Sequence, residues 1–467
     1  MSFTSGDFFV FFVALLAVYW LLPRVSWQNM LLLAASYLFY GWVHPWYAAL
    51  LGFSTLADYG LTHLLLRRPE RRRTWLMLSL LVNLGVLAFF KYYNYFSGDL
   101  AQALTALGAN GSTLLVKVIL PVGLSFYTLK KLAYMLDISR GTLKPAASLI
   151  NFALFVSFFP QIVAGPIDRA QKMLPQMERK RDWKANWFHA AWPLLVMGLF
   201  KKFVVADSLK VMVDRIYTVE QPTIVLVLAA TLAFAVQILA DFSAYTDLAR
   251  GLAYLLGFET SENFQKPYLS LTPTAFWNRW HITLSGWLRD YIFFPLRRAL
   301  LRQKELPGRL AVVLPPLVTM FICGLWHGAG WTFVLWGVFH GLLIAAYQLA
   351  GLGGSWKPST RIRAGLAWVV MFSFTLIGWL LFRAPSLPWL GDLLLHAPWM
   401  HGPEDLVVGL ITLTMTLAYS LPLVIHAALE RVHGKWDWLA GGFYAVMLAA
   451  VIVYLNPSPP DFIYFQF

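Results

Sequence analysis

Residues 310–349 read LAVVLPPLVTMFICGLWHGAGWTFVLWGVFHGLLIAAYQL, and this stretch decides the class of fold. It contains two apolar runs, 310–325 and 331–349, on either side of a short glycine-rich turn at 328–330. A helix that crosses a membrane needs about 20 predominantly apolar residues. The stretch therefore predicts two membrane helices joined by a turn.

The composition of the rest of the chain extends this prediction. Of 467 residues, 59% are hydrophobic and only 13% are charged, whereas soluble domains carry about 25% charged residues. The length allows roughly ten to thirteen membrane crossings. We expect an all-α polytopic membrane protein that forms a single transmembrane domain over residues 1–467.

The formal net charge of +14 does not indicate nucleic-acid binding, because the basic residues stand in short clusters between apolar runs. Basic clusters in short loops mark the cytoplasmic side of a membrane protein. Four clusters follow this pattern: Arg67, Arg68, Arg71, Arg72 and Arg73; Arg169, Lys172, Arg179, Lys180, Arg181 and Lys184; Arg297, Arg298, Arg302, Lys304 and Arg309; Lys357, Arg361 and Arg363.

These clusters also predict the orientation of both termini. Apolar runs at 8–22, 30–42 and 46–66 lead back from the first cluster and place the N-terminus outside. Runs at 368–381, 406–425 and 438–455 lead forward from the fourth cluster, so that residues 383–405 and the C-terminus also lie outside.

The middle of the chain is less regular. The apolar segments 151–162, 195–205 and 269–294 are short, or are interrupted by proline, lysine, arginine and histidine. Broken segments at membrane depth require protein or a water-filled cavity around them. We expect region 121–296 to contain re-entrant segments around a central cavity.

Ionisable residues within membrane segments are costly and are functional candidates. They concentrate in three places. Residues 241–247 read DFSAYTD, residues 276–290 read FWNRWHITLSGWLRD, and residues 324–331 read GLWHGAGW, with His340 further on.

The last two of these motifs resemble the paired signatures of the membrane-bound O-acyltransferase (MBOAT) superfamily. Further motifs resemble its alginate O-acetyltransferase-like branch: Ser36-Tyr-Leu-Phe-Tyr40, Pro121-Val-Gly-Leu-Ser-Phe-Tyr127, Phe155-Val-Ser-Phe-Phe-Pro-Gln161, Ala164-Gly-Pro166, Asn263-Phe-Gln-Lys-Pro-Tyr268 and Leu381-Phe-Arg-Ala384. The chain departs from this branch at Arg297-Arg-Ala299, where a glycine-rich pair is usual, and at Lys130-Lys131. These departures leave the substrate open.

The resemblance implies that His327 is catalytic, and the chemistry agrees. Transfer of an acyl group from a thioester to a hydroxyl needs a base, and histidine titrates near neutrality. One continuous helix from Leu310 would rise roughly 25 Å to His327. This histidine would then lie past the midplane of the membrane.

The resemblance makes His281 a second catalytic candidate. It would orient His327, hold the donor, or serve a second site; as a structural residue it would bond to Asp290 or to a carbonyl group. The supporting candidates are Asn278, Arg279, Asp290, Trp326 and Asp247. We expect Arg279 and Arg289 to pair with Asp247 or Asp290, because an unpaired buried arginine is costly. No ligand spacing indicates a metal site.

The C-terminal residues 457–467 form a predicted periplasmic aromatic tail that contains Tyr464. Such residues often anchor a protein at the membrane interface. Related acylation systems resemble this chain in having a tyrosine-bearing C-terminus. That similarity makes the Tyr464 hydroxyl a candidate acyl relay.

The resemblance therefore implies a bacterial inner-membrane O-acyltransferase. It would move an acyl group, foremost acetyl, from a cytoplasmic thioester such as acetyl-CoA to an outer hydroxyl of an exopolysaccharide or cell-wall glycan. It would need no bound cofactor and would work with membrane lipid and a periplasmic glycan O-acetyltransferase. Two alternatives remain open, D-alanyl transfer from a carrier protein to teichoic acid, and a transporter.

Overall fold

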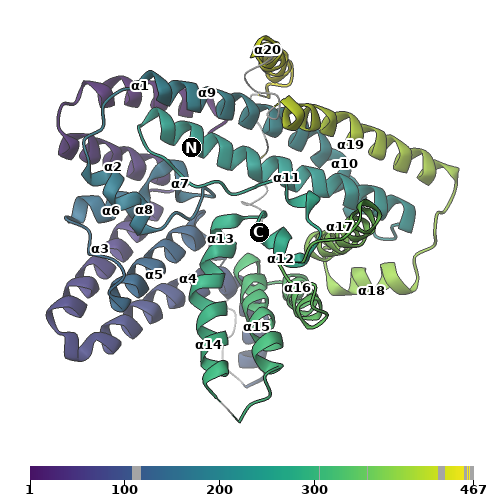
Figure 1. Cartoon of the computed structure of the whole chain (residues 1–467), viewed down its shortest axis with the longest axis horizontal. Coiled ribbons are helices and arrows are strands. Elements are labelled where there is room, and N and C mark those ends of the chain that lie inside the picture. The colour runs from purple at the N-terminus through teal and green to yellow at the C-terminus, as the bar shows by residue number, and fades with distance from the viewer. Residues whose placement is uncertain are drawn as a thin grey trace. The chain divides into compact units, whose positions relative to one another are not determined.

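The computed structural model describes residues 1–107, 117–303, 305–354, 356–429, 437–456, 460 and 462, and over these residues the regular structure is helical (Figure 1). The β pairing within them is one isolated antiparallel bridge between Phe264 and Trp280. The all-α prediction is confirmed. The chain forms two compact units, Met1–Ala191 with Leu252–Ser261, and Trp192–Gly251 with Glu262–Phe467.

The first unit is built mainly from the N-terminal helices. These are α1 (Gly6–Leu21), α2 (Val25–Gly41), α3 (Pro45–Arg67), η1 (Pro69–Arg71), α4 (Arg72–Ala106), α5 (Leu124–Arg140), α6 (Leu149–Ser157), α7 (Phe159–Ile162) and α8 (Ala170–Glu178). The side-chain oxygens of Ser5 and Ser148 cap α1 and α6 by accepting a backbone N–H of the first turn.

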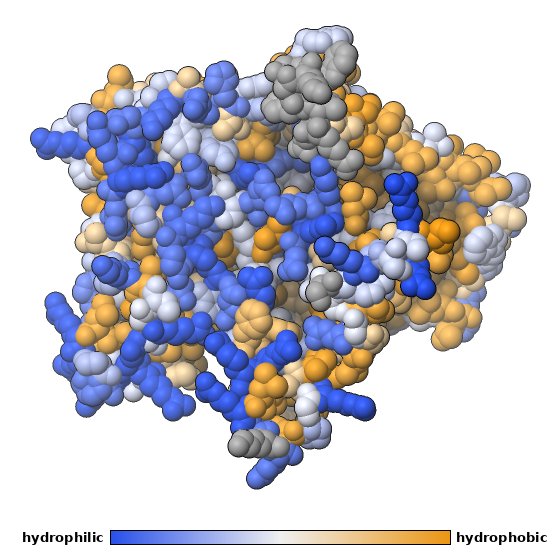
Figure 2. Space-filling model, in the orientation of Figure 1, coloured by the Kyte–Doolittle hydropathy of each residue, from blue (hydrophilic) through white to orange (hydrophobic). Residues whose placement is uncertain are grey.

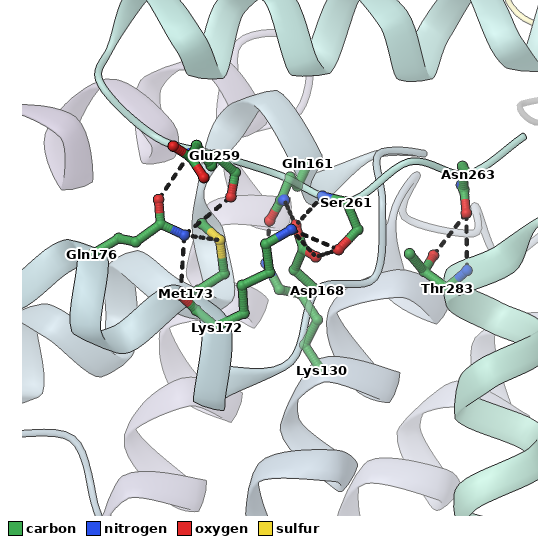
Figure 3. Close-up of polar contacts among 10 residues, drawn as sticks. All are labelled: Lys130, Gln161, Asp168, Lys172, Met173, Gln176, Glu259, Ser261, Asn263 and Thr283. Atoms are coloured by element: carbon green, nitrogen blue, oxygen red, sulfur yellow. Dashed lines mark hydrogen bonds and ion pairs between the residues drawn. The ribbon is translucent and has the colours of Figure 1, made fainter.

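Helix α5 is buried along most of its length, although it carries Lys130 and Lys131. The Lys130 ammonium donates to Gln161 Oε1 at 3.1 Å, and Gln161 Nε2 donates to Asp168 Oδ2 at 2.7 Å (Figure 3). Asp168 also accepts from the backbone N–H of Ser261 at 3.1 Å. Buried polar groups need such partners, and this network joins α5 to the segment after α11 within the first unit.

Two helices are shared between the units, α9 (Ala185–Phe200) and α11 (Ile224–Leu255). The remaining elements belong to the second unit. They are η3 (Lys201–Ala206), α10 (Asp207–Tyr217), η4 (Pro267–Leu269), α12 (Pro273–Trp277), α13 (Ile282–Leu288), η5 (Arg289–Phe293), α14 (Phe294–Arg302), α15 (Leu310–His327), α16 (Trp331–Leu349), α17 (Arg361–Arg383), α18 (Leu387–Leu395), α19 (Pro403–Leu429) and α20 (Asp437–Val453).

The predicted turn at 328–330 joins α15 and α16 into an antiparallel pair. Their backbones touch, because a Cβ atom on Gly324 would lie 2.3 Å from the Phe333 carbonyl oxygen, and one on Gly337 would lie 2.4 Å from that of Met320. Only glycine allows this approach. The α15–α16 pair forms the scaffold that carries His327 at its turn.

The three irregular segments of the sequence are broken helices. Segment 151–162 divides at Phe158 into α6 and α7, and 195–205 changes from α-helix to the π-helix η3. Segment 269–294 divides into η4, α12, α13 and the π-helix η5. Their predicted placement as re-entrant segments stays a prediction.

Seven described helices are long and apolar enough to cross a membrane: α3, Pro69–Gly98, α11, α15, α16, α17 and α19. Gly6–Leu21 and Trp438–Val453 are shorter apolar helices. Figure 2 shows hydrophobic residues gathered over α19, where Leu406, Leu410, Leu417 and Leu421 are exposed. An outer surface of this kind suits lipid, since water would solvate it poorly.

Candidate active site

His327 is the last residue of α15 and is 7% exposed. Aromatic rings surround it, with ring centroids at 4.9 Å for Trp326, 5.1 Å for Trp336 and 5.3 Å for Phe382. These rings come from α15, α16 and α17. The imidazole is therefore held in a mostly apolar aromatic shell, where a proton transfer would be shielded from bulk water.

A cavity of about 130 Å³ lies beside this shell in the second unit. Its lining comes from α12, α13, η5, α15 and α16. Most of the lining is apolar, with the polar side chains of Asn278, Ser285, Arg289 and Gln348 among it. A mostly apolar wall with a few polar groups is the usual character of a small-molecule site.

Trp336 connects the cavity wall with His327. The ring of Trp277, which lines the cavity, lies 5.7 Å from the ring of Trp336 between centroids. The Trp336 ring in turn lies 5.1 Å from that of His327. One indole ring thus lies in contact with both the cavity wall and the candidate base.

His281 lies between α12 and α13, outside the candidate membrane spans, and is fully buried. Its Nδ1 is 3.2 Å from Asn263 Oδ1, so one of its contacts is to the carbonyl oxygen of a side-chain amide. Burial lowers the pKa of His281 to about 3. The Trp326 ring, 6.1 Å away, contacts His281 as well as His327.

The expected arginine partners are found in part. Arg289 pairs with Asp290 at 3.1 Å, as predicted, but both side chains are about half exposed. Asp247 is paired with a lysine, Lys201 of η3, at 2.6 Å. The backbone carbonyl of Arg279 accepts from Gln265 N–H at 3.0 Å, which fixes the backbone of that residue.

Asn278 lines the cavity and Trp326 contacts both histidines, so these two supporting candidates lie at the site. His340 packs between the rings of Trp277 and Trp336, at 5.2 and 5.0 Å. Within the described ranges, no three His, Cys, Asp or Glu side chains are close enough to hold a metal ion.

Tyr464 lies outside the described residues. The nearest described aromatic residue of the tail is Phe462, which is buried. Its ring lies 4.5 Å from the Lys202 ammonium and 5.1 Å from the Tyr245 ring. Lys202 pairs with Asp207 at 2.8 Å and with Asp241 at 3.0 Å, so Phe462 packs on a buried charged cluster of the second unit.

Sequence reasoning missed three residues of this site. Asn263 belonged to a motif quoted above but received no role, because its partners His281 and Thr283 lie 18 and 20 positions further along the chain. Trp277 lies in the quoted motif 276–290 but received no role, and Trp336 has no signal beyond its size. Their roles depend on how α12 meets α16, which spacing along the chain does not reveal.

Comparison with known proteins supports one family. Residues 143–382 match the model of the MBOAT, membrane-bound O-acyltransferase family. The probable alginate O-acetylase AlgI of Pseudomonas aeruginosa is 35% identical over 394 residues, which cover 83% of this chain and 73% of that protein. The peptidoglycan O-acetyltransferase of Helicobacter pylori is 33% identical over 76% of this chain and 71% of its own length.

A more distant relative is the teichoic acid D-alanyltransferase of Bacillus subtilis, 28% identical over 56% of this chain and 68% of that protein. The family model covers the two histidines and the cavity wall, and the acetyl-transferring relatives extend along most of the sequence. The chain is a multi-pass membrane enzyme that belongs to the membrane-bound O-acyltransferase family.

Proposed function

We propose that this O-acyltransferase moves an acetyl group from a cytoplasmic thioester, such as acetyl-CoA, to a hydroxyl on the outer side of the bacterial inner membrane. The finished product is an O-acetylated exopolysaccharide or cell-wall glycan. The acetyl group is favoured because the alginate and peptidoglycan relatives match a larger share of the chain, at higher identity, than the D-alanyltransferase.

The observation that carries the proposal is the cavity whose Trp277 wall touches Trp336 and, through it, His327. Its apolar lining and its few polar side chains suit the amide-containing arm of coenzyme A. Arg297, Arg298 and Arg302 follow on α14, after the cavity residues Arg289 and Phe293. Their charge would attract the phosphates of the donor.

In this reaction His327 accepts the proton of the attacking hydroxyl. The new carbon–oxygen bond forms at the thioester carbonyl, the carbon–sulfur bond breaks, and the thiolate leaves. The imidazolium then returns its proton to the thiolate, which restores His327. Histidine suits both steps because its ordinary pKa lies near neutrality.

The proposal includes two further participants, the side chain of Tyr464 and a second protein. Tyr464 carries the acetyl group as a phenyl ester, since a tyrosine hydroxyl with a pKa near 10 is a better leaving group than a sugar hydroxyl. A separate periplasmic transferase then takes it to the glycan. The burial of Phe462, two residues before Tyr464, supports an anchored tail.

D-alanyl transfer from a carrier protein is the second candidate, favoured only by the shorter match to the D-alanyltransferases. The transporter alternative has no support beyond the broken helices, which an acyltransferase of this family also explains.

The test is transfer of labelled acetyl from acetyl-CoA by purified protein in lipid. Replacing His327→Ala should lower turnover by about 10²- to 10⁴-fold, the usual value of a general base, with an unchanged folded yield. The matched control is His189→Ala, because His189 is an exposed histidine on α9. Near-normal turnover in His327→Ala would remove His327 as the base. Transfer from a D-alanyl carrier protein but not from acetyl-CoA would favour the second candidate.

A further inference from the structure

Asn263 makes three hydrogen bonds to Ile282 and Thr283, the two residues that follow His281 in its turn. Its backbone carbonyl accepts from Ile282 N–H at 3.0 Å. Its side-chain Oδ1 accepts from Thr283 N–H at 3.1 Å and from the Thr283 hydroxyl at 2.9 Å (Figure 3). Asn263 is 2% exposed, so these contacts are shielded from water.

The turn itself is conformationally costly. His281 has a φ of 42°, in the left-handed region that residues other than glycine rarely adopt. Such a conformation persists only where the surroundings impose it, and it often occurs at functional sites. Here the two backbone N–H groups that follow His281 both donate to Asn263, which supplies that restraint.

These contacts also determine which atom of the Asn263 amide faces His281. A backbone N–H can only donate, so the side-chain atom 3.1 Å from Thr283 N–H must be the oxygen. The same oxygen lies 3.2 Å from His281 Nδ1. With an oxygen as its partner, Nδ1 must carry the proton and donate it. The lone pair of the neutral ring then lies on Nε2.

The surroundings of His281 favour the neutral ring. The Phe242 ring lies 4.8 Å away and the Trp326 ring 6.1 Å away, at the centroids. Burial lowers the pKa of this histidine, because a charged imidazolium is poorly solvated away from water. The imidazole is thus an acceptor at Nε2 and not a cation.

We propose that Asn263 is a positioning residue that fixes the proton of His281 on Nδ1 and thereby presents Nε2 as the proton-accepting nitrogen of this ring. This inference rests on the proposed function where it concerns acyl transfer. The tautomer itself is a property of the folded protein, and it can be measured without any turnover.

The first experiment is ¹⁵N NMR of histidine-labelled protein in lipid, with His281→Gln to assign the signals of His281. Protonated and lone-pair ring nitrogens resonate far apart, so the spectrum identifies the tautomer. We expect the Nδ1–H form in the wild type and a mixture of tautomers in Asn263→Ala. A wild-type spectrum with the proton on Nε2 would overturn the proposal, whether or not acetyl transfer is observed.

The second experiment measures acetyl transfer as a function of pH. Asn263→Ala should lower kcat by about 10-fold or more, since the proton-accepting nitrogen of His281 is then no longer fixed. Asn263→Asp keeps the acceptor oxygen but places a carboxylate beside the imidazole, which raises the pKa of His281. Its activity should recover at high pH, and the acidic limb of the profile should move to higher pH.

The matched control is Thr283→Val, which removes a hydroxyl bond to the same oxygen but keeps the backbone bond and the His281 contact. It should leave the acidic limb in place. An unshifted limb in Asn263→Asp, with an active wild type, would overturn the positioning role and leave the proposed function standing. An inactive wild type would instead count against the proposed function alone.

Discussion

Lys131 and Asp58 form an ion pair inside the first unit, with 3.3 Å between Nζ and Oδ2 and 1% exposure for each side chain. Ser79 and Asn83 donate to the same carboxylate at 2.6 and 2.8 Å. Removing one partner of such a pair leaves the other charge buried and unpaired, which lowers the free energy of unfolding by about 3–5 kcal/mol. We expect Lys131→Met and Asp58→Asn each to lower the melting temperature in detergent.

The double variant separates charge pairing from simple loss of contacts. Asp58→Asn removes the negative charge but keeps an oxygen that can still accept from Ser79 and Asn83, and Lys131→Met removes the positive charge. No charge is then left unpaired, so the protein with both substitutions should melt above either single variant. A loss of melting temperature equal to the sum of the two single losses would show that the pair is not coupled.

The sequence marks Lys130 and Lys131 as departures from the family pattern, but it does not reveal their partners. Asp58 is 73 positions from Lys131, and Gln161 is 31 positions from Lys130. Likewise, Asn263 and His281 are 18 positions apart and meet through the bridge between Phe264 and Trp280. Partners across elements depend on packing, which hydrophobic periodicity does not describe.

At the scale of elements, the α15–α16 pair depends on its glycines. An alanine methyl group at Gly337 would lie 2.4 Å from a backbone oxygen, and backbone cannot give way as a flexible side chain can. We expect Gly337→Ala to separate the helices, displace His327, and cost about 1–3 kcal/mol. Thermal melting and acetyl transfer should both fall.

The matched control is Gly365→Ala on α17, where an added Cβ meets nothing within 4 Å. Alanine is about 1 kcal/mol more favourable than glycine within a helix, so this variant should be as stable as the wild type or more stable. Equal behaviour of the two variants would show that the close approach of α15 and α16 is not needed.

The long apolar elements were predictable and the broken ones were not. The run at 331–349 became α16 with the same bounds, because apolar length alone defines a membrane helix. Segment 269–294 was predicted to be irregular, yet its division into η4, α12, α13 and η5 was not. Those breaks arise from tertiary contacts, such as the hydrogen bond between Asn263 Oδ1 and Thr283 N–H in the turn at His281.

At the scale of the whole molecule, composition predicts the class of protein more accurately than it predicts the number of membrane crossings. The described residues contain seven helices that meet the length and apolarity of a span, fewer than the roughly ten to thirteen that length allows. Part of the difference is that α1 and α20 are apolar but shorter, with 16 and 17 residues.

The orientation in the membrane is the last prediction, and it rests on the basic clusters. Its test uses single cysteines in a Cys323→Ala background, since Cys323 is the one cysteine of the sequence and is buried. Arg71→Cys, Arg302→Cys and His396→Cys are exposed positions in three loops or at helix ends. A fourth cysteine is added after Phe467.

In intact spheroplasts, an impermeant maleimide should label His396→Cys and the C-terminal cysteine. Arg71→Cys and Arg302→Cys should react only after permeabilisation, because both lie in clusters predicted to be cytoplasmic. In the proposed reaction the thioester donor is cytoplasmic and the glycan lies outside, so the acetyl group would have to leave the reaction centre on the outer side. Labelling of the C-terminal cysteine only in permeabilised cells would place the tail with the donor, and Tyr464 could not then pass the acetyl group outward.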